Sequence, residues 1–248
     1  MKVLINGMCG FMGNEVLKLC KENYLDCQAV CGVDAFCKEQ GETPCFKSYD
    51  EVNIEADIII DFSHHSVTER LLKFAVSKKL PLVLCTTGHT EEEKQAIYNA
   101  SKQIPIFYSA NMSVGVSLLV ELAKKVAISM PNADIEIIEV HHNRKVDAPS
   151  GTALMFYDAL KEVRTNAKAV MGRSGQSKRT VEEIGIHSLR MANVVGEHQV
   201  IVATANQTIT LKHEAHSRAL FAEGALTAGV YLAKQNAGLY NMKSMLAE

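Results

Sequence analysis

Short apolar runs and longer amphipathic segments alternate through the first half of the chain, and this alternation constrains the fold more than any other feature. The amphipathic segments near residues 11–22, 66–79 and 91–102 are expected to be helices. The apolar runs are rich in Val and Ile and too continuous to leave one face in water, so they predict strands buried on both faces. These strands are expected at Val3–Ile5, Ala29–Val33, Ile58–Ile60, Leu82–Cys85 and Ile106–Tyr108. Strands that alternate with helices predict an α/β fold built on a doubly wound parallel sheet.

A different pattern begins near Ser113, because the later strands follow one another without helices between them. The expected elements are, in order, a helix over 113–130, a strand over Ile135–Val140, a helix over 151–163, strands over Gly185–Arg190, Gln199–Ala203 and Thr208–Lys212, and a final helix over 218–234. Closely spaced strands are typical of an antiparallel or mixed sheet. We therefore expect an inserted α+β domain over residues 113–217, within a first domain made of residues 1–112 and completed by residues 218–248.

Charge and composition exclude several classes of protein. The chain of 248 residues has 26 Lys and Arg against 28 Asp and Glu, so no overall basic field attracts nucleic acid. The longest stretch without a charged residue, Gln103–Val120, is interrupted by Pro, Ser, Asn and Gly and does not predict a membrane span. Seven cysteines without a Cys-x-x-Cys pair fit neither a disulfide framework nor a zinc ribbon, and reduced thiols in a cytoplasmic protein are expected.

A glycine-rich turn follows the first strand. Residues 7–13 have the sequence Gly-Met-Cys-Gly-Phe-Met-Gly, with the spacing G-x-x-G-x-x-G. In a Rossmann-type domain such a turn lets the backbone approach a pyrophosphate at the start of a helix, although the spacing alone also fits an ordinary tight turn. Asp34, 21 residues after Gly13 at the end of the second strand, favours nucleotide binding because its carboxylate can accept hydrogen bonds from ribose hydroxyls. We therefore expect the first domain to bind a dinucleotide.

A second group of reactive side chains follows the first strand of the inserted domain. Residues 139–153 have the sequence Glu-Val-His-His-Asn-Arg-Lys-Val-Asp-Ala-Pro-Ser-Gly-Thr-Ala. Ser150 is a typical N-cap, so the N–H groups of Gly151 and Thr152 are expected to point out of the helix start. Any one of these residues alone would fit a solvated strand end. Imidazoles, cations and a helix N-terminus together predict a site for a small anionic dicarboxylate and a proton donor.

Other His and Cys residues have ordinary structural explanations. The His-Glu-Ala-His sequence at 213–216 lacks the i, i+4 spacing of a helical metal motif, so a histidine pair at a strand end is expected. His64–His65 fits a helix start and a neighbour of the cofactor equally well. Cys9 and Cys85 are expected to be small packing residues without chemistry. Packing, with a backbone that borders a ligand, is also expected of Met8, Met12 and Met112.

Three shorter motifs accompany the segment 139–153: Cys-Thr-Thr-Gly at 85–88, Ser-Ala-Asn-Met-Ser-Val-Gly-Val at 109–116 and Val-Gly-Glu-His at 195–198. Together the four segments resemble the dihydrodipicolinate reductase family, also called 4-hydroxy-tetrahydrodipicolinate reductase, and the resemblance covers essentially the whole chain. It implies reduction, by NADH or NADPH, of the cyclic dicarboxylate that the preceding synthase of the diaminopimelate and lysine pathway makes. The product would be tetrahydrodipicolinate, formed with loss of water.

The resemblance also implies the roles of individual residues. His141 corresponds to the family's acid/base histidine and Lys145 to its proton donor. The residues expected to hold the substrate are His142, Ser150, Gly151 and Thr152. The residues expected to line the cofactor are Gly7, Met8, Cys9, Gly10, Phe11, Met12, Asp34, Thr86, Thr87, Gly88, Ala110, Asn111, Met112, Ser113, Arg218 and Phe221. Similar proteins are homotetramers that assemble through the sheet of the inserted domain.

Two positions depart from the family pattern. Phe11 stands where many members have Arg, and Ala35 follows Asp34 where members that accept NADPH often have Arg. Asp34 should repel the 2′-phosphate of NADPH, and only Lys38 is close enough in the sequence to offset that repulsion. The sequence therefore favours NADH, or dual use of NADH and NADPH.

Three alternatives stay open. Another two-domain dehydrogenase, acting on homoserine, aspartate or diaminopimelate, would share the first domain but not the His-His, Arg-Lys and Ser-Gly-Thr groups. A non-catalytic NADH-binding redox sensor would not need a full acid/base and carboxylate cluster. A family member that keeps the motifs but reduces its substrate poorly would look the same. The sequence also leaves open whether His141 or Lys145 donates the proton.

Overall fold

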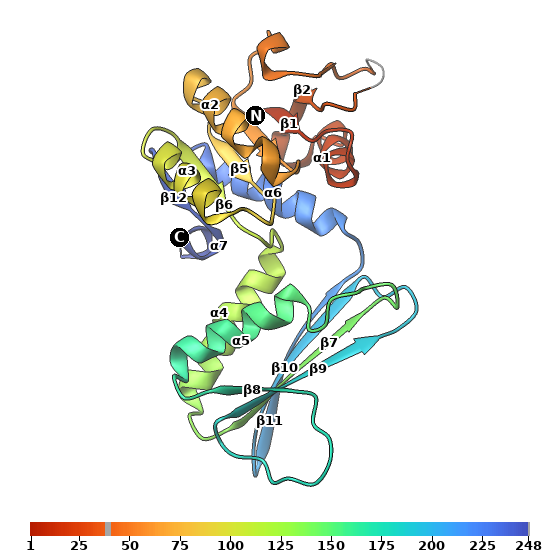
Figure 1. Cartoon of the computed structure of the whole chain (residues 1–248), viewed down its shortest axis with the longest axis vertical. Coiled ribbons are helices and arrows are strands. Elements are labelled where there is room, and N and C mark those ends of the chain that lie inside the picture. The colour runs from red at the N-terminus through yellow and green to blue at the C-terminus, as the bar shows by residue number, and fades with distance from the viewer. Residues whose placement is uncertain (38–40, 248) are drawn as a thin grey trace. The chain divides into compact units, whose positions relative to one another are not determined.

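A parallel sheet forms the centre of the first of two compact units, which comprises Met1–Ser113 and Arg218–Glu248. The structure is a computed structural model, and it describes residues 1–37 and 41–247. Within these residues the strand order is β12-β6-β5-β4-β1-β2-β3, and every neighbouring pair is parallel (Figure 1). The strands are β1 (Lys2–Asn6), β2 (Gln28–Val33), β3 (Cys45–Phe46), β4 (Ile58–Asp61), β5 (Leu82–Leu84), β6 (Pro105–Tyr108) and β12 (Gly238–Tyr240). The predicted parallel sheet is confirmed, and β3 and β12 extend its edges beyond the expected strands.

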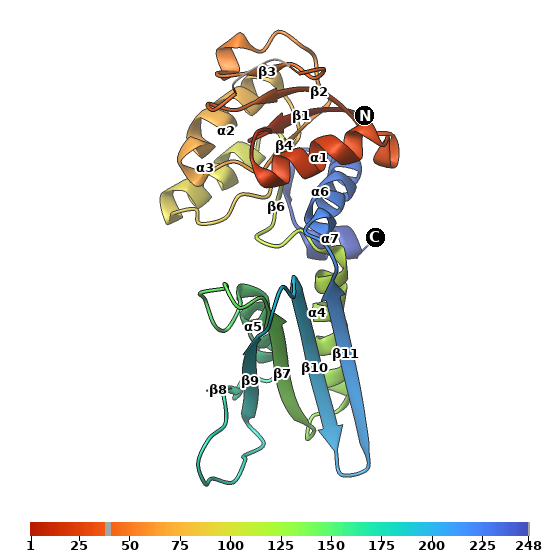
Figure 2. The same ribbon diagram turned by 90° about the vertical axis from the view of Figure 1, so that its right-hand side faces the viewer.

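Helices cover both faces of this sheet (Figure 2). They are α1 (Phe11–Lys21), α2 (Thr68–Lys78), α3 (Glu91–Ser101), α6 (Ala219–Leu232) and α7 (Met242–Leu246). Successive residues of β1 point to opposite faces, so Val3 and Ile5 pack in one core with α1 and α6, while Leu4 packs in the other with α2 and α3. The sheet is therefore doubly wound, as the alternation of strands and helices predicts.

The chain order of the strands reverses beside β1. The chain passes from β1 to β2 and β3 on one side, whereas β4, β5 and β6 lie on the other side. In open parallel sheets, ligands bind outside the carboxyl ends of the strands at such a reversal. Since β1 ends at Asn6 and β4 ends at Asp61, these two residues mark where a ligand is expected.

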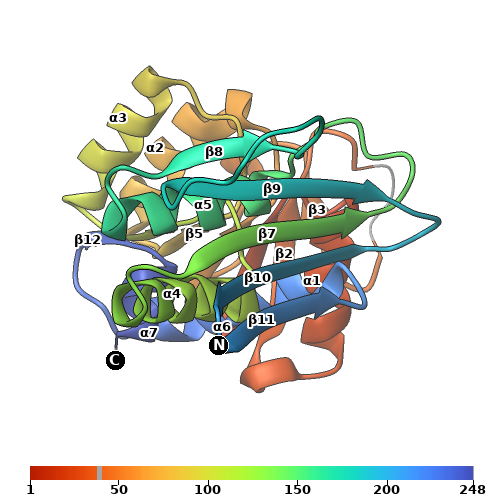
Figure 3. The ribbon, with the colours of Figure 1, turned by 90° about the horizontal axis from the view of Figure 1, so that it is seen from below.

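A mixed sheet forms the second unit, Val114–Ser217, with strand order β11-β10-β7-β9-β8 in the described residues (Figure 3). Strand β10 is antiparallel to β7 and β11, whereas β7, β9 and β8 are parallel. The elements are α4 (Val114–Ser129), β7 (Asp134–His141), α5 (Gly151–Val163), β8 (Lys168–Met171), β9 (Glu183–Arg190), β10 (Gly196–Thr204) and β11 (Gln207–Ala215). The predicted mixed sheet is confirmed. No helix among residues 1–37 and 41–247 is long and apolar enough to cross a membrane.

One face of the mixed sheet packs against both helices of its unit. Ile135 and Ile137 of β7 are fully buried in a core with Phe156 of α5 and Val116 of α4. Because strand side chains alternate, Glu139 is the next residue of β7 on this face, and it is 0% exposed. A carboxylate without access to water must be paired, so Glu139 needs hydrogen-bond and charge partners inside the second unit.

Candidate active site

A buried carboxylate joins the strand ends of the first unit. Asp61 is 1% exposed. Its Oδ1 accepts hydrogen bonds from Asn6 Nδ2 at 2.7 Å and Ser63 Oγ at 2.6 Å, and its Oδ2 accepts one from Thr86 Oγ1 at 2.7 Å. Burial raises the pKa of Asp61 even though these hydrogen bonds oppose the shift. The network holds the carboxyl ends of β1, β4 and the loop after β5 in a fixed arrangement.

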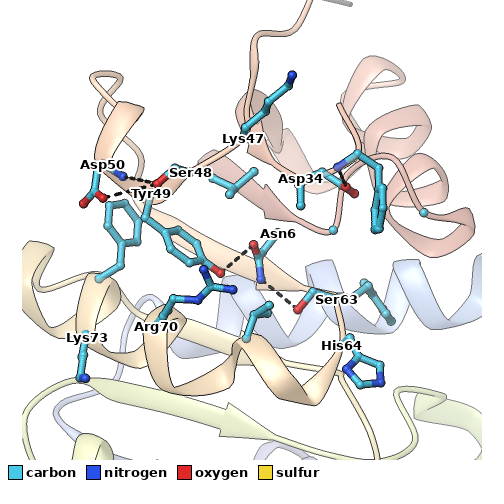
Figure 4. A pocket seen from close by; sticks show the side chains of 18 of the residues that line it. Asn6, Asp34, Lys47, Ser48, Tyr49, Asp50, Ser63, His64, Arg70 and Lys73 are labelled. Carbon is cyan, nitrogen blue, oxygen red and sulfur yellow. Dashed lines mark hydrogen bonds between the residues drawn. The ribbon is translucent and has the colours of Figure 1, made fainter. Parts of the chain in front are cut away.

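A cavity of about 650 Å³ lies at these strand ends. Three of the predicted cofactor residues, Gly7, Gly10 and Asp34, line it. Figure 4 shows Tyr49 and Asn6 in the same cavity, where the Tyr49 hydroxyl donates a hydrogen bond to Asn6 Oδ1 at 3.0 Å. Cavities of several hundred cubic ångströms at this place in an α/β sheet are typical of small-molecule and cofactor sites.

Three cations that the sequence pattern does not single out also line the cavity: Lys47, Arg70 and Lys73 (Figure 4). Arg70 and Lys73 belong to α2, where charged residues are typical of a solvated helix face. Lys47 follows β3, whose two residues are too few to give a periodic pattern. Asp34 and Asp50 line the same cavity, so the three cations leave its lining with only a small excess of positive charge, which suits a phosphate-bearing ligand.

Backbone geometry explains two glycines of the turn between β1 and α1. Gly7 has φ of +79°, a conformation that favours glycine. A Cβ on Gly13 would lie 2.1 Å from the Gly7 carbonyl oxygen, so no side chain fits there. Beside the turn, Asp34 accepts hydrogen bonds from the N–H groups of Cys9 at 3.0 Å and Phe36 at 2.9 Å. Each Asp34 oxygen retains a lone pair, so the carboxylate can still accept from ribose hydroxyls.

The other predicted cofactor residues all lie elsewhere in the first unit, outside the lining of this cavity. The guanidinium of Arg218 lies 5.6 Å from the centre of the Phe11 ring, so the structure brings these two candidates together. Thr86 is buried and its hydroxyl is bonded to Asp61, whereas Thr87 and Gly88 are exposed. The side chain of Thr86 therefore supports the strand ends, and the residues after it face solvent.

The loop after β6 combines exposed and buried candidates. Ala110 is exposed, while the N–H of Ser113 donates to Asn111 Oδ1 at 2.9 Å and shapes the turn. Phe221 of α6 is partly buried against the core. The packing interpretation of the three methionines is confirmed, since these side chains lie in or against that same core: Met8, Met12 and Met112.

The remaining His and Cys candidates, except Cys9, have structural roles in agreement with expectation. His64 caps a short 3₁₀-helix by accepting from the Ser66 N–H at 3.3 Å, which confirms the interpretation as a helix start. It also lines the cavity, and its place beside a cofactor stays a prediction. The pair at 213–216 lies at the end of β11, as predicted. Cys85 is buried, whereas Cys9 is exposed, so the expectation of a buried residue is wrong for Cys9. Cys9 is exposed because it sits in the turn rather than in the strand before it.

Glu139 is the centre of the cluster in the second unit. Its carboxylate accepts two hydrogen bonds from Arg190 at 2.8 Å each, one from the Ser150 N–H at 3.1 Å and one from His141 Nδ1. Burial raises the pKa of Glu139, but the hydrogen bonds from Arg190 and His141 outweigh burial and lower the pKa to about 2. Glu139 is therefore ionised at neutral pH and can stabilise a positive charge on His141.

The orientation of the His141 ring follows from this pairing. An ionised carboxylate only accepts hydrogen bonds, so the proton of His141 lies on Nδ1 and Nε2 is the atom left for other chemistry. A Cβ on Gly196 would lie 3.1 Å from Nε2, so the glycine leaves room for the ring. The His198 ring packs edge-on against it, with ring centres 5.1 Å apart.

Lys145 lies in the turn that follows β7. Its ammonium is 2.9 Å from Asp147 Oδ1, and this partner lowers the pKa of Asp147. Arg190 also donates to the Asp147 carbonyl oxygen at 2.6 Å, so one guanidinium contacts both the buried carboxylate and the lysine turn. Arg190 therefore connects the Glu139 carboxylate, which pairs with His141, to the turn that carries Lys145.

The start of α5 lies next to Glu139, whose carboxylate accepts a hydrogen bond from the Ser150 N–H. Ser150 is the N-cap predicted from the sequence, because its Oγ accepts from the Ala153 N–H at 3.2 Å. The same hydroxyl pairs with His198 Nε2 at 3.0 Å, and burial lowers the pKa of His198 to about 4. His198 is therefore neutral at pH 7. Gly151 is exposed, and the position that a Cβ would take there is open, so the first N–H groups of the helix can meet an anion.

Arg190 and the role of Glu139 are not evident from sequence reasoning. A carboxylate two residues before His141 on a strand shares its face, and this spacing is the signal that could have identified Glu139. Arg190 lies 51 residues from Glu139 and reaches it through the pairing of β7 with β9. No local pattern encodes that contact.

Family models match both units. A model described as "Dihydrodipicolinate reductase, N-terminus" matches residues 1–112, and one described as "Dihydrodipicolinate reductase, C-terminus" matches residues 115–246. A curated 4-hydroxy-tetrahydrodipicolinate reductase of Clostridium tetani is 43% identical over 99% of this chain and 96% of its own length. A 4-hydroxy-tetrahydrodipicolinate reductase of Caldanaerobacter subterraneus is 45% identical over 99% of this chain and 98% of its own length.

Solved structures show the same architecture. A dipicolinate-bound dihydrodipicolinate reductase from Paenisporosarcina sp. TG-14 superposes with a TM-score of 0.82 at 25% identity, over 97% of both chains. A diaminopimelate dehydrogenase of C. glutamicum has a TM-score of 0.59 at 13% identity, covering 98% of this chain and 92% of that one. The second similarity concerns the fold alone.

Proposed function

Because this chain belongs to the dihydrodipicolinate reductase family, we propose that it reduces 4-hydroxy-tetrahydrodipicolinate to tetrahydrodipicolinate, with NADH or NADPH and loss of water, in diaminopimelate and lysine biosynthesis. The observation that carries the proposal is the Glu139 cluster, in which an imidazole, an ammonium and a helix N-terminus belong to one short segment. The relative from Paenisporosarcina is described as bound to dipicolinate, a planar dicarboxylate. A site of this chemistry suits such a ligand.

In this proposal the first unit binds the nicotinamide cofactor, which supplies a hydride when bound. The N–H groups at the start of α1 would meet the diphosphate, and Asp34 would accept from the hydroxyls of the adenosine ribose. The three cations in the lining of the cavity support binding of an anionic cofactor. The rest of the cofactor site is proposed to come from residues 8–12, 86–88 and 110–113 with Arg218 and Phe221.

The second unit is proposed to bind the substrate and supply a proton. The N–H groups of Gly151 and Thr152, with Ser150 at the cap and His142, would hold a substrate carboxylate. Loss of the substrate 4-hydroxyl as water gives a conjugated imine. Hydride then adds to an electron-poor carbon of this imine, and the displaced electron pair must take up a proton. Lys145, an ammonium paired with Asp147, and His141, an imidazole bonded to Glu139, are the two candidates for that proton.

A homotetrameric, cytoplasmic enzyme is part of the same proposal. The cytoplasm suits the reduced thiols expected of the sequence. Helices α4 and α5 cover one face of the mixed sheet, and the opposite face carries half-buried apolar side chains of β7 and β10: Ile138, Val140 and Ile201. Such side chains suit contact with another copy of the chain. A light-scattering mass near four times 27.2 kDa would support the tetramer, and a monomer mass would contradict it.

The experiment that tests the activity follows NADH and NADPH oxidation in the presence of fresh product of the pyruvate and aspartate-semialdehyde condensation. Rapid oxidation that depends on the synthase is expected. A folded protein that binds NADH but does not oxidise it under these conditions would contradict the proposal and favour the redox sensor or an altered substrate.

NADH, or dual use of NADH and NADPH, is proposed as the cofactor preference, with Asp34 as the residue that favours NADH. Its carboxylate would repel the 2′-phosphate of NADPH, whereas the cations of the same cavity would attract it. Ala35 adds no charge. Lys38, the cation that the sequence places near Asp34, lies outside the described residues.

Asp34→Asn is expected to raise the ratio of kcat/KM for NADPH to kcat/KM for NADH by about tenfold, which corresponds to about 1.4 kcal/mol of removed repulsion. Steady-state kinetics with both cofactors measures the ratio. Asp26→Asn, at an exposed carboxylate of the same unit with positive φ that Asn tolerates, is the matched control and should leave the ratio unchanged. An unchanged ratio for Asp34→Asn would show that this carboxylate does not set the preference.

A further inference from the structure

Three cysteines from separate segments of the first unit come together beside the glycine turn. Cys9 belongs to the turn between β1 and α1, Cys37 follows β2, and Cys45 begins β3. Their Sγ atoms all lie within 4.8 Å of one another. Among residues 1–37 and 41–247, no other group of His, Cys, Asp and Glu side chains gathers closely enough to hold a metal ion.

The geometry of this thiol cluster is close to that of a three-sulfur metal site. Thiolate sulfurs bind Zn²⁺ at about 2.3 Å, so three of them around one ion lie about 4 Å apart. The observed limit of 4.8 Å therefore needs a shift of less than about 1 Å to close around an ion. Cys9 is exposed while Cys45 is buried, so an ion would reach the cluster from the solvent side of the turn.

We propose that Cys9, Cys37 and Cys45 form a binding site for a soft d¹⁰ metal ion, Zn²⁺ or Cu⁺. Three thiolates suit Cu⁺ directly, and Zn²⁺ would complete four-coordination with a water at the exposed side of Cys9. Binding replaces the three thiol protons, which pass to the solvent. No other function described for this chain uses these sulfur atoms.

The cluster adjoins the groups that we propose hold the cofactor. Cys9 lies between Gly7 and Gly10, which line the cavity, and its N–H donates to Asp34 Oδ2 at 3.0 Å. Three thiolates with one Zn²⁺ leave one excess negative charge next to Asp34. That charge opposes an anionic dinucleotide, so bound metal weakens NADH binding; this consequence, unlike the metal site itself, rests on the proposed function.

The metal site is tested on the full-length, reduced, tag-free chain without any activity measurement. Titration with Zn²⁺ by calorimetry, and with Cd²⁺ by the ultraviolet thiolate charge-transfer band, is expected to give one ion per chain. Cys9→Ser, at the exposed position, and Cys45→Ala should each weaken binding at least tenfold. Cys31→Ala, at a fully buried cysteine in the other core of the sheet, is the matched control and should bind as the parent does.

Equal Zn²⁺ binding by Cys9→Ser and the parent, or no charge-transfer band with Cd²⁺, would overturn the site. The second readout is NADH affinity by fluorescence, which should fall about threefold or more when Zn²⁺ is present and not in Cys9→Ser. Metal binding without that change would overturn the coupling to the cofactor. If the chain binds Zn²⁺ but shows no reductase activity, the proposed function fails while the metal site stands.

Discussion

Replacing Lys145 by Ala is expected to lower kcat by about 10²- to 10⁴-fold while NADH binding stays close to that of the parent. The loss is that of a positioned general acid. The Lys145 ammonium lies 2.9 Å from Asp147 Oδ1 and belongs to the second unit, whereas the cofactor is proposed to bind the first. Stopped-flow turnover in the synthase-coupled assay, with NADH affinity measured by fluorescence, separates the two effects.

Lys161→Ala removes an exposed lysine from the last turn of α5 and serves as the control, with unchanged kcat expected. His141→Ala is expected to lose most turnover as well, because its ring is the other proton donor that the cluster offers. The variant with the larger loss, together with the loss of one limb of the pH–rate profile, identifies the immediate donor. Near-normal turnover in both variants would remove the proton-donor role from this segment.

Glu139→Gln is expected to lower the free energy of unfolding by about 3–5 kcal/mol and to reduce kcat by at least tenfold. The carboxylate is 0% exposed and is the partner of both Arg190 and His141. The amide keeps the shape but leaves the guanidinium without its counter-charge, and it cannot stabilise an imidazolium. Urea unfolding and the synthase-coupled assay measure the two effects.

Glu136→Gln provides a matched control on the same strand. Glu136 lies on the opposite face of β7, is 29% exposed and pairs with His187 at 2.9 Å, so its loss should cost no more than about 1 kcal/mol and leave kcat unchanged. If Glu139→Gln and Glu136→Gln changed the free energy of unfolding and kcat equally, the burial of Glu139 would contribute to neither stability nor turnover.

The effect of Glu139→Gln on the free energy of unfolding depends on pH, because the pKa of Glu139 is lowered in the folded protein. The pKa of Glu139 is about 2 in the fold and near its ordinary 4.5 in the unfolded chain, so the carboxylate stabilises the fold fully above pH 4.5. This stabilisation is lost as the pH falls towards 2. The difference in stability between the parent and Glu139→Gln should therefore narrow over that range.

The sequence by itself determined the layout of the first unit and the ends of several elements. Val3–Ile5 and Ile58–Ile60 could be identified as strands because a parallel strand covered on both faces must be apolar at every position. Ser150 could be identified as a cap because a hydroxyl satisfies an N–H three residues further along. The tight turn at Gly7 and Gly13 could be identified in the same way, from the spacing of the glycines after the first strand. Each of these inferences depends on residues within one turn or strand, where chemistry and spacing are enough.

Contacts between distant segments were decided only by the tertiary structure. Arg190 meets Glu139 because β9 pairs with β7 in one register, and Arg70 reaches the cavity because α2 begins beside the end of β4. Strand β3, with two residues, exists through its pairing with β2, and that pairing also brings Cys45 to Cys9. A local pattern fixes which face a side chain occupies, but the partner across that face depends on strand register and loop closure, which no short window of sequence encodes.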